Sequence, residues 1–352
     1  MQKKHYLVSV IDSVEATHPG LGELVALELL TVKAGKFLLC IGAHGTGKSV
    51  ASSFINKHAP ASVTIDRLSV AGLASISEEL SDFKGSIIVD DIAKSQTVYA
   101  RTSTVTSIAE LVYSHGVSSH MSKLHFEIKN FNGSAIVNIQ PVLLRQLSTS
   151  PEWEASIADK SIRYYHLRRP LFPVLEPPDL KIKWGLDLEQ VKTPNLDNKP
   201  FNSALSAYGG HWTHGRRKEH ITDLLKAAAA FDSRATAGRL DIELVTRLLK
   251  PLLIEQLVME KQDFEAKREL KNNKLAILTE FFSYGNFTLD QLALDYGGSK
   301  KQAYKLMKQL NDDWEIKGAK PITYGLSEKL EARLFAAGLL EAKNQKPKGA
   351  RA

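Results

Sequence analysis

The segment Gly42–Ser49 has residue types and a spacing that suit the binding of phosphate groups. It reads GAHGTGKS and fits the pattern G-x-x-x-x-G-K-[ST] in full. Glycines let the backbone turn so that successive N–H groups point inward at a phosphate. Lys48 would bring a cation to the β- and γ-phosphates, and the hydroxyl of Ser49 would ligate Mg²⁺. The segment therefore predicts a phosphate-binding loop (P-loop) for ATP and Mg²⁺.

The residues expected to contact the nucleotide are Gly42, His44, Gly45, Thr46, Gly47, Lys48, Ser49 and Val50. His44 is not expected to be a catalyst, because the four positions inside the motif vary freely. A glycine-rich turn with an incidental lysine is the alternative interpretation. It is disfavoured because an apolar strand precedes the motif and a helical pattern follows it, as a P-loop requires.

Two further polar sites follow apolar strands. Asp90 and Asp91 come after the run IIV, and Asn138 comes after AIV. In P-loop proteins the first acid lies beside Mg²⁺ and a second can polarise the attacking water. We therefore expect Asp90 to join Ser49 at the metal and Asp91 to be catalytic. The alternatives are a strand that runs into an Asp-rich turn and an asparagine in an ordinary turn.

The sequence also predicts a framework that would bring these strand ends together. Strands are expected at residues 36–41, 62–65, 85–89, 124–128 and 135–139, and helices at 21–31, 50–57, 69–80 and 103–115. Most of these strands are continuously apolar, and 124–128 alternates like an exposed strand. Such strands alternating with helices indicate an α/β fold with a parallel sheet covered on both faces.

The order of these motifs resembles the AAA+ superfamily of oligomeric P-loop ATPases over roughly the first half of the chain. The resemblance rests on the P-loop, the strand at 62–65, IIVDD (Ile87–Asp91) and AIVN (Ala135–Asn138). It implies a P-loop NTPase sheet, a homo-oligomer, and catalytic roles for Lys48, Asp91 and Asn138, the last as the water-orienting residue called sensor 1. AAA+ proteins usually carry Asp-Glu where this chain has Asp-Asp. The shorter side chain of Asp91 leaves slow hydrolysis or a switch-like role open.

The same resemblance implies arginines that complete the site. In AAA+ proteins one arginine comes from the neighbouring subunit, and another, sensor 2, lies early in a lid helix and touches the γ-phosphate. Lys160 occupies the position that the first arginine usually holds. The candidates are Arg163 and Arg145 for the first role and Arg216 and Arg217 for the second. The alternative for each is an ordinary solvated arginine.

Composition sets broader limits on the protein. The net charge of +7 and the pI of about 9.2 favour polyanionic partners, although many basic proteins never bind nucleic acid. No apolar run is long enough to span a bilayer, and the N-terminus does not read as a signal peptide. We therefore expect no membrane association and a cytoplasmic location, or the host cytoplasm if the source is viral or plasmid-borne. The single cysteine, Cys40, excludes an intrachain disulfide and is expected to be buried.

The C-terminal part resembles a winged helix-turn-helix domain. Helices are expected at 274–282, 287–296, 299–310 and 327–339, with a β-hairpin at 314–326. The helix at 299–310 carries a lysine face, and its expected DNA contacts are Lys300, Lys301, Gln302, Lys305 and Lys308. Such contacts would be mostly to phosphates and weakly sequence-specific. Winged helices also dock proteins, and lysine faces are often merely solvated.

The sequence thus predicts five parts: a P-loop ATPase core at 1–168, a proline-rich connector at 169–205, a helical lid at 206–262, a winged helix at 263–342 and a disordered tail at 343–352. The expected function is an ATPase that acts on DNA in replication initiation, helicase loading or DNA mobilisation. The alternatives are a nucleotide-switched transcriptional or protein-docking regulator with little turnover, and a DNA translocation or packaging motor.

Overall fold

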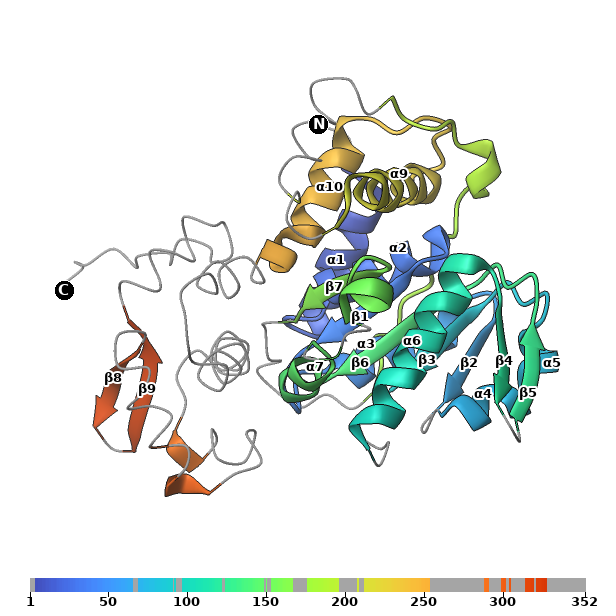
Figure 1. Ribbon diagram of the computed structural model, residues 1–352. Helices are drawn as coiled ribbons and strands as arrows, with labels where there is room; N and C mark the ends of the chain where they lie inside the picture. Colours follow the sequence, from blue (N-terminus) through green and yellow to red (C-terminus); the bar gives the residue numbers. More distant parts are fainter. Residues whose placement is uncertain are drawn as a thin grey trace. The chain divides into compact units, whose positions relative to one another are not determined.

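The fold is described from a computed structural model (Figure 1). The described residues are 4–65, 69–90, 92, 97–121, 124–148, 150, 153–166, 176–195, 208, 212–253, 288–290, 299–301, 304, 314–319 and 321–327. The chain divides into two compact units, Met1–Tyr284 and Gly285–Ala352. The predicted boundary between lid and winged helix, at 262/263, lies outside the described residues.

The first unit is an α/β structure built on a five-stranded parallel sheet. The strand order is β2 (Ser62–Ile65), β3 (Ser86–Val89), β6 (Ser134–Ile139), β1 (Phe37–Ile41) and β7 (Ser161–Tyr165). Every residue of β1, β3, β6 and β7 is buried, whereas the edge strand β2 is partly exposed. Continuous burial explains why these strands are apolar runs rather than alternating ones. The predicted parallel sheet is confirmed, and β7 was not predicted.

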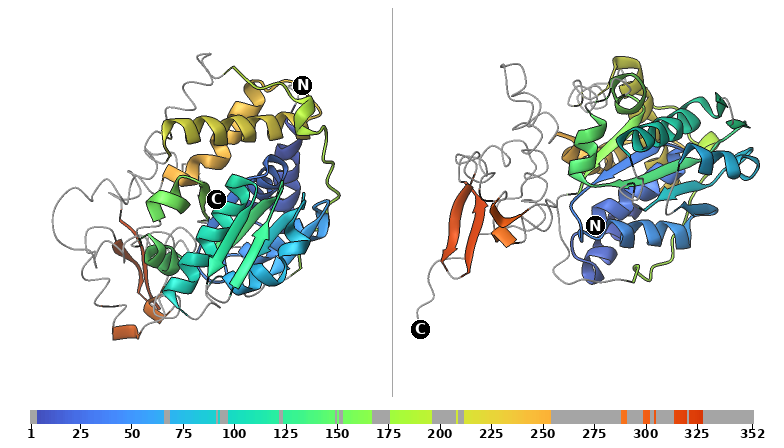
Figure 2. Two further views of the ribbon diagram at one scale, coloured as in Figure 1. Left: turned by 45° about the vertical axis from the view of Figure 1, so that its right-hand side comes forward. Right: turned by 60° about the horizontal axis from the view of Figure 1, so that its bottom comes forward.

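Helices cover both faces of this sheet (Figures 1 and 2). One face carries α6 (Val98–Ser114) and α7 (Pro141–Leu147). The other carries α1 (Tyr6–Thr17), α2 (Gly22–Ala34) and α3 (Lys48–His58), whose buried side chains form one core with those of the sheet. The helix α1 was not predicted, although its buried residues Leu7, Val10, Ile11 and Val14 have helical spacing.

Three local predictions differ from the structure. The helix expected at 69–80 is two short ones, α4 (Val70–Ser75) and α5 (Ser77–Leu80), because the backbone leaves the helical region at Ile76. The helix expected at 103–115 begins earlier, where the hydroxyl of Thr97 caps α6. The exposed strand at 124–128 is confirmed as β5 (Leu124–Ile128), but it pairs with an unpredicted strand, β4 (Val117–Met121), in a separate antiparallel hairpin.

Residues 176–195 of the proline-rich connector belong to the first unit and, apart from a short 3₁₀ helix at Leu188–Gln190, form no helix or named strand. Their apolar side chains alternate, and Leu180, Ile182, Trp184, Leu186 and Leu188 pack against the core. The indole Nε1 of Trp184 donates to the carbonyl of His58, the last residue of α3 (3.0 Å). Its ring also lies 5.4 Å from that of Phe231. This is the arrangement expected of a connector laid on a surface.

The region expected to be a lid contains α9 (His214–Phe231) and α10 (Arg239–Leu249). Both belong to the first unit, and the buried run Ala227–Ala230 of α9 joins the same core as α1 and α2. A short 3₁₀ turn, η4 (Lys250–Leu253), follows α10. Two other short helical segments are η2 (Trp153–Ala158) and η3 (Leu188–Gln190).

The second unit contains a β-hairpin of β8 (Trp314–Ala319) and β9 (Ile322–Leu326). The hairpin predicted at 314–326 is therefore confirmed. Residues 289–290, 300–301 and 304 are helical. The remainder of the predicted winged helix, and the tail at 343–352, lie outside the described residues. Among the helices that the structure describes, none combines the length and apolarity needed to cross a bilayer.

Candidate functional site

The predicted P-loop joins β1 to the first turn of α3. Gly45 and Gly47 have φ angles of +73° and +88°, which residues with a side chain rarely adopt. At Gly42 a Cβ atom would lie 3.1 Å from the carbonyl oxygen of His166, so a side chain there would be crowded. The glycine positions of the motif are thus required by the backbone path. His44 and Ser49 are exposed, while Thr46 and Val50 are buried.

The ammonium group of Lys48 lies inside the loop. Its Nζ donates to the carbonyl oxygens of Gly42 and Ala43, both at 2.7 Å, and lies 3.4 Å from Oγ1 of Thr46. The residue is only 9% exposed. Carbonyl oxygens hold this cation where the loop curves, and a phosphate group in the same curve would attract it more strongly because it carries full negative charge.

Asp90 and Asn138 lie side by side at the same edge of the sheet as this loop. Val89 pairs with Val137, so the next residues of β3 and β6 are neighbours. The amide Nδ2 of Asn138 donates to Oδ1 of Asp90 at 3.2 Å. Because β6 also pairs with β1, the P-loop leaves the sheet from the adjacent strand. The structure therefore brings together Lys48, Asp90 and Asn138, whereas Asp91 lies outside the described residues.

A buried polar chain continues from Asn138 into the helices. Its Nδ2 also donates to Oγ of Ser52 on α3 at 2.9 Å, and Ser52 donates to Oε1 of Glu28 on α2 at 3.3 Å. Glu28 is fully buried, and burial raises the pKa of its carboxyl well above the ordinary value. Sequence reasoning missed Glu28 and Ser52. The available signal was an acid between two leucines at the centre of the largely apolar helix α2.

His166 is a second residue that sequence reasoning missed. It follows β7, is 1% exposed, and its Nε2 donates to the carbonyl of Thr46 inside the P-loop at 2.8 Å. Its backbone N–H donates to the carbonyl of Ile41, where β1 ends. The residue supports the loop from the neighbouring strand. No sequence signal marked it, because the contact depends on the pairing of β7 with β1.

We expect His166→Ala to weaken the predicted binding of ATP at this loop by roughly tenfold, because a loop that loses an internal support must be ordered by the ligand instead. His166→Gln retains a side-chain donor and should bind more tightly than the alanine variant. Equilibrium titration with a fluorescent ATP analogue measures both. Equal affinities for the alanine variant and the wild type would show that His166 does not support the loop.

The expectation that Arg163 acts on a neighbouring subunit is not compatible with its position. Arg163 lies within β7 and is 3% exposed. Its guanidinium donates to the carbonyls of Ala158 and Ser161 and lies 6.0 Å from the ring of Trp153. A buried guanidinium cannot reach another subunit without leaving these partners. Arg145 belongs to α7, and its side chain lies outside the described part of the chain.

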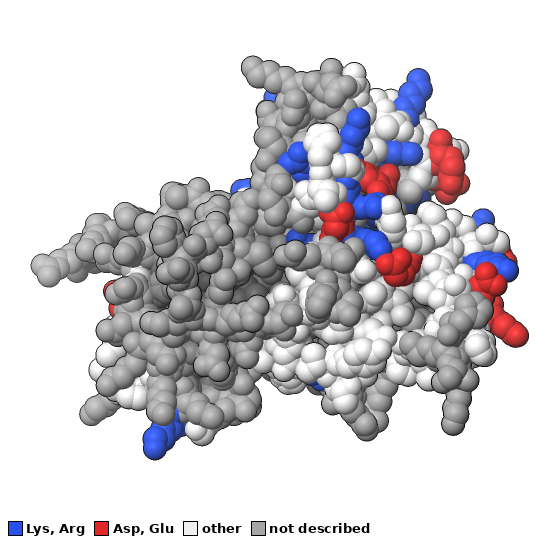
Figure 3. All heavy atoms as spheres, viewed as in Figure 1, with Lys and Arg blue, Asp and Glu red and all other residues white. Residues whose placement is uncertain are grey.

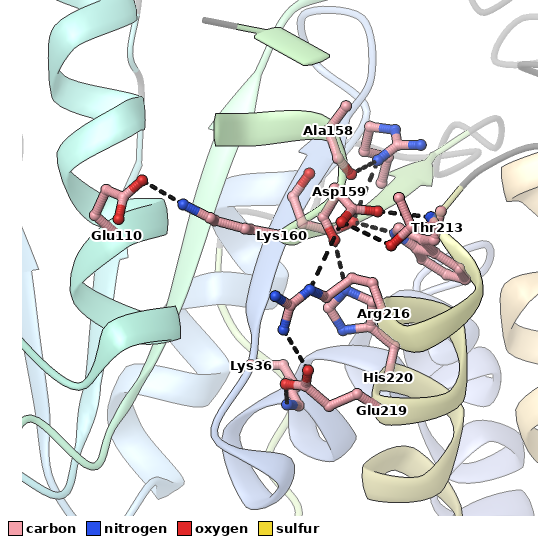
Figure 4. Close-up of polar contacts among 12 residues, drawn as sticks. Lys36, Glu110, Ala158, Asp159, Lys160, Thr213, Arg216, Glu219 and His220 are labelled. Carbon is pink, nitrogen blue, oxygen red and sulfur yellow. Dashed lines mark hydrogen bonds and ion pairs between the residues drawn. The ribbon is translucent and has the colours of Figure 1, made fainter. Parts of the chain in front are cut away.

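The sensor 2 expectation for Arg216 is also corrected. Arg216 bonds Glu219, and Glu219 accepts from Lys36 at 2.8 Å (Figure 4). Lys36 immediately precedes β1, whereas the P-loop follows β1, so this cluster lies at the opposite edge of the sheet, about 16 Å away at ~3.3 Å per residue. Arg216 therefore does not face the loop of its own chain. Arg217 lies on the same first turn of α9, where its Nη2 is 3.1 Å from Nδ1 of His214.

The cluster around Arg216 holds α9 to the core. Its guanidinium stacks on the ring of Tyr113 at 3.6 Å, and Asp159 accepts from the N–H and hydroxyl of Thr213. Lys160 pairs with Glu110 of α6. On the face drawn in Figure 3, basic and acidic side chains lie interspersed around α9, as such a network requires.

His220 lies at the centre of this cluster and should make stability depend on pH. Its Nε2 donates to the carbonyl of Asp159, and burial, with the charge of Lys36, lowers its pKa from 6.5 to about 4. The unfolded chain takes up a proton between these two pH values and the folded chain does not. Stability is therefore complete above pH 6.5, and on the order of 3 kcal/mol is lost as pH falls toward 4.

Chemical unfolding of wild type and His220→Gln from pH 7 to pH 4 measures this contribution, since glutamine keeps a donor but does not titrate. The difference between the two curves isolates His220. A difference that does not change with pH would contradict the expectation.

No protein-family model matches the chain, and no curated protein shows significant similarity to it. The class of protein is therefore defined by its architecture: an α/β protein with a parallel sheet flanked by helices, compatible with a P-loop fold. Lys48, Asp90 and Asn138 lie at the carboxyl edge of that sheet.

Proposed function

We propose that the first unit is an AAA+-like P-loop ATPase that binds ATP and Mg²⁺ at residues 42–50 and hydrolyses the nucleotide. One observation carries the proposal: a glycine-turned loop with an internal lysine lies at the start of α3, beside the hydrogen-bonded pair Asp90 and Asn138. A helix start, a cation and a carboxylate at one sheet edge are the groups that phosphate and Mg²⁺ require.

The residues present fit both ligands. The left-handed backbone at Gly45 and Gly47 turns the loop as a phosphate cradle requires, and Ser49 is exposed at the helix start. Asp90 is half-buried and offers a hard oxygen ligand at the same edge of the sheet as the loop. Ser49 and Asp90 would hold Mg²⁺, which supplies charge neutralisation at the phosphates when bound.

Each residue of the site would then have a separate role in hydrolysis. Lys48 binds the β- and γ-phosphate oxygens, and the backbone N–H groups of the loop orient them. Asn138 places an amide beside the attacking water, and Asp91 accepts the proton of that water. The P-loop helix adds its positive N-terminal dipole.

We further propose that the second unit contacts DNA as a winged helix and that the protein acts as a homo-oligomer in replication initiation, helicase loading or DNA mobilisation. The support is the net charge of +7, the hairpin β8–β9, and the exposed Lys300 and Lys301 on a helical segment. Lys300 pairs with Asp290 at 2.9 Å, which leaves Lys301 as the better-placed phosphate contact. Gln302, Lys305 and Lys308 lie outside the described residues.

The deciding experiment measures ATP binding by titration and steady-state ATP hydrolysis, each without DNA, with duplex DNA and with single-stranded DNA. Both proposals predict that DNA stimulates turnover and that Asp91→Ala abolishes turnover. The double variant Lys301→Glu/Lys305→Glu should keep the turnover measured without DNA and lose only the stimulation by DNA. Failure of the wild type to bind ATP under any condition would overturn the first.

A nucleotide switch is the second candidate. It is favoured by Asp91, where the related ATPases usually carry the longer glutamate, and by Lys160, which replaces an arginine and is paired with Glu110. Tight ATP binding with negligible turnover in every arm of the same experiment would select this candidate.

A further inference from the structure

The position of Glu28 is unusual for an acid. It lies in α2 between Leu27 and Leu29, and all three side chains are fully buried. No described basic side chain pairs with it, and its Oε2 has no hydrogen-bond partner within the described part of the chain. A leucine would satisfy the surroundings better, because a buried polar atom without a partner destabilises the fold. Glu28 therefore calls for an explanation other than packing.

The hydrogen bonds from Asn138 to Glu28 run in one direction when Oε1 of Glu28 accepts, as a carboxylate oxygen or as the carbonyl oxygen of the acid. An amide nitrogen can only donate, so Ser52 must accept from Nδ2 of Asn138. Ser52 has a single hydroxyl hydrogen, which points to Oε1 of Glu28. Both Nδ2 hydrogens are then used, one on Ser52 and one on Asp90. The acceptor Glu28 thus forces the amide nitrogen, rather than the amide oxygen, toward Asp90.

Without Glu28 the direction of these hydrogen bonds would no longer be set. The Ser52 hydroxyl could turn and donate to Oδ1 of Asn138, which has no partner among the described residues. The amide would then rotate by half a turn, and its oxygen would face the carboxylate of Asp90, where two acceptors repel one another. We propose that Glu28, acting through the Ser52 hydroxyl, is the positioning residue that fixes which way the Asn138 amide faces at the candidate nucleotide site.

The catalytic consequence rests on the proposed function. If Asn138 orients water, misorientation should lower kcat and leave the affinity for ATP nearly unchanged, because the P-loop contacts are intact. Glutamine can place its amide oxygen where Oε1 of Glu28 lies and so offers the Ser52 hydroxyl the same acceptor, whereas leucine offers none. Glu28→Gln should therefore behave like wild type, whereas Glu28→Leu should not.

The test observes the side-chain amide of Asn138 directly by NMR. Protein labelled with ¹⁵N only at asparagine gives side-chain NH₂ signals in NMR, and the Asn138 pair is identified by its loss in Asn138→Asp. In Glu28→Leu and in Ser52→Ala both hydrogens of this pair should shift, and their exchange with water should quicken by roughly tenfold or more, as for a lost buried hydrogen bond. Glu28→Gln should retain the wild-type signals, and Leu30→Ala serves as a cavity-forming control in the same helix.

An unmoved Asn138 pair in both Glu28→Leu and Ser52→Ala would overturn the proposal. If Glu28→Leu does not fold, an unmoved Asn138 pair in Ser52→Ala alone would overturn the proposal. Since the spectra are recorded without nucleotide, they decide the role of Glu28 even if the wild type hydrolyses no ATP. With an active wild type, Glu28→Leu should show a kcat lowered by roughly tenfold at an unchanged affinity for ATP.

Discussion

Lys48→Ala should reduce ATP binding or turnover by roughly a thousandfold, the factor expected when the cation that faces two phosphate groups is removed from a site sheltered from water. The ammonium already lies within the loop, held by the carbonyls of Gly42 and Ala43. It therefore needs little reorganisation to meet a phosphate. Titration with a fluorescent ATP analogue and steady-state hydrolysis provide the two measurements.

Lys48→Arg is the matched control for this prediction. Arginine keeps the charge but its planar group does not fit the same carbonyl pair, so an intermediate loss is expected. Circular dichroism and thermal unfolding should show that both variants fold. Wild-type turnover in Lys48→Ala would refute the nucleotide-site assignment.

Asp241→Ala should destabilise the first unit by about 3 kcal/mol, the upper end of the range for losing hydrogen bonds to a buried charged group. Asp241 is fully buried and receives two bonds from Arg234, at 2.8 and 2.6 Å. It also accepts from Nε2 of His5 at 3.1 Å and from the N–H of Gly238 at 2.7 Å. The network ties the start of α1 to the start of α10.

The contacts of Asp241 also predict how the stability of the first unit changes as the pH is lowered. Burial alone would raise the pKa of this carboxyl, but the bonds from His5 and Arg234 outweigh it and hold the pKa below its ordinary value. Its stabilisation is present above pH ~3.9 and is lost as pH falls through the lowered folded-state pKa. Arg239→Ala on the same helix is the control: its pair with Glu243 is exposed, and the loss should stay below about 0.5 kcal/mol. Urea unfolding at pH 7 compares the two variants, and similar losses would contradict the argument.

The local pattern of residues was sufficient to predict four of the five strands of the parallel sheet. The strands β1, β2, β3 and β6 were predicted because each is a short, mainly apolar run beside a turn or a helix. The strand β7 was missed because Arg163 interrupts its apolar pattern, and only the structure shows that this arginine folds back on the preceding carbonyls. The strand β4, which reads VSSHM, has no alternating pattern to recognise.

Within the candidate site, residues that belong to a recognisable local motif were predictable and those without such a motif were not. The P-loop pattern indicated Lys48, and a polar residue at the end of an apolar run, together with the resemblance to AAA+ proteins, indicated Asp90 and Asn138. His166 and Glu28 reach the site from other elements, and nothing in their neighbours along the chain points to a nucleotide. Arg216 illustrates the converse: its place at the start of a helix suited sensor 2, but the direction of β1 puts that helix start at the far edge of the sheet.

The contacts of Trp184 give the molecule an internal optical probe. Its indole N–H is bonded to the last residue of the P-loop helix, and its ring rests on the last residue of α9. Indole fluorescence is sensitive to hydrogen bonding and to exposure to water. A chain that keeps Trp184 but carries phenylalanine at Trp153, Trp212 and Trp314 would therefore emit from a single reporter between two helices. Its emission wavelength would record any movement of α3 against α9 in real time, without an attached dye.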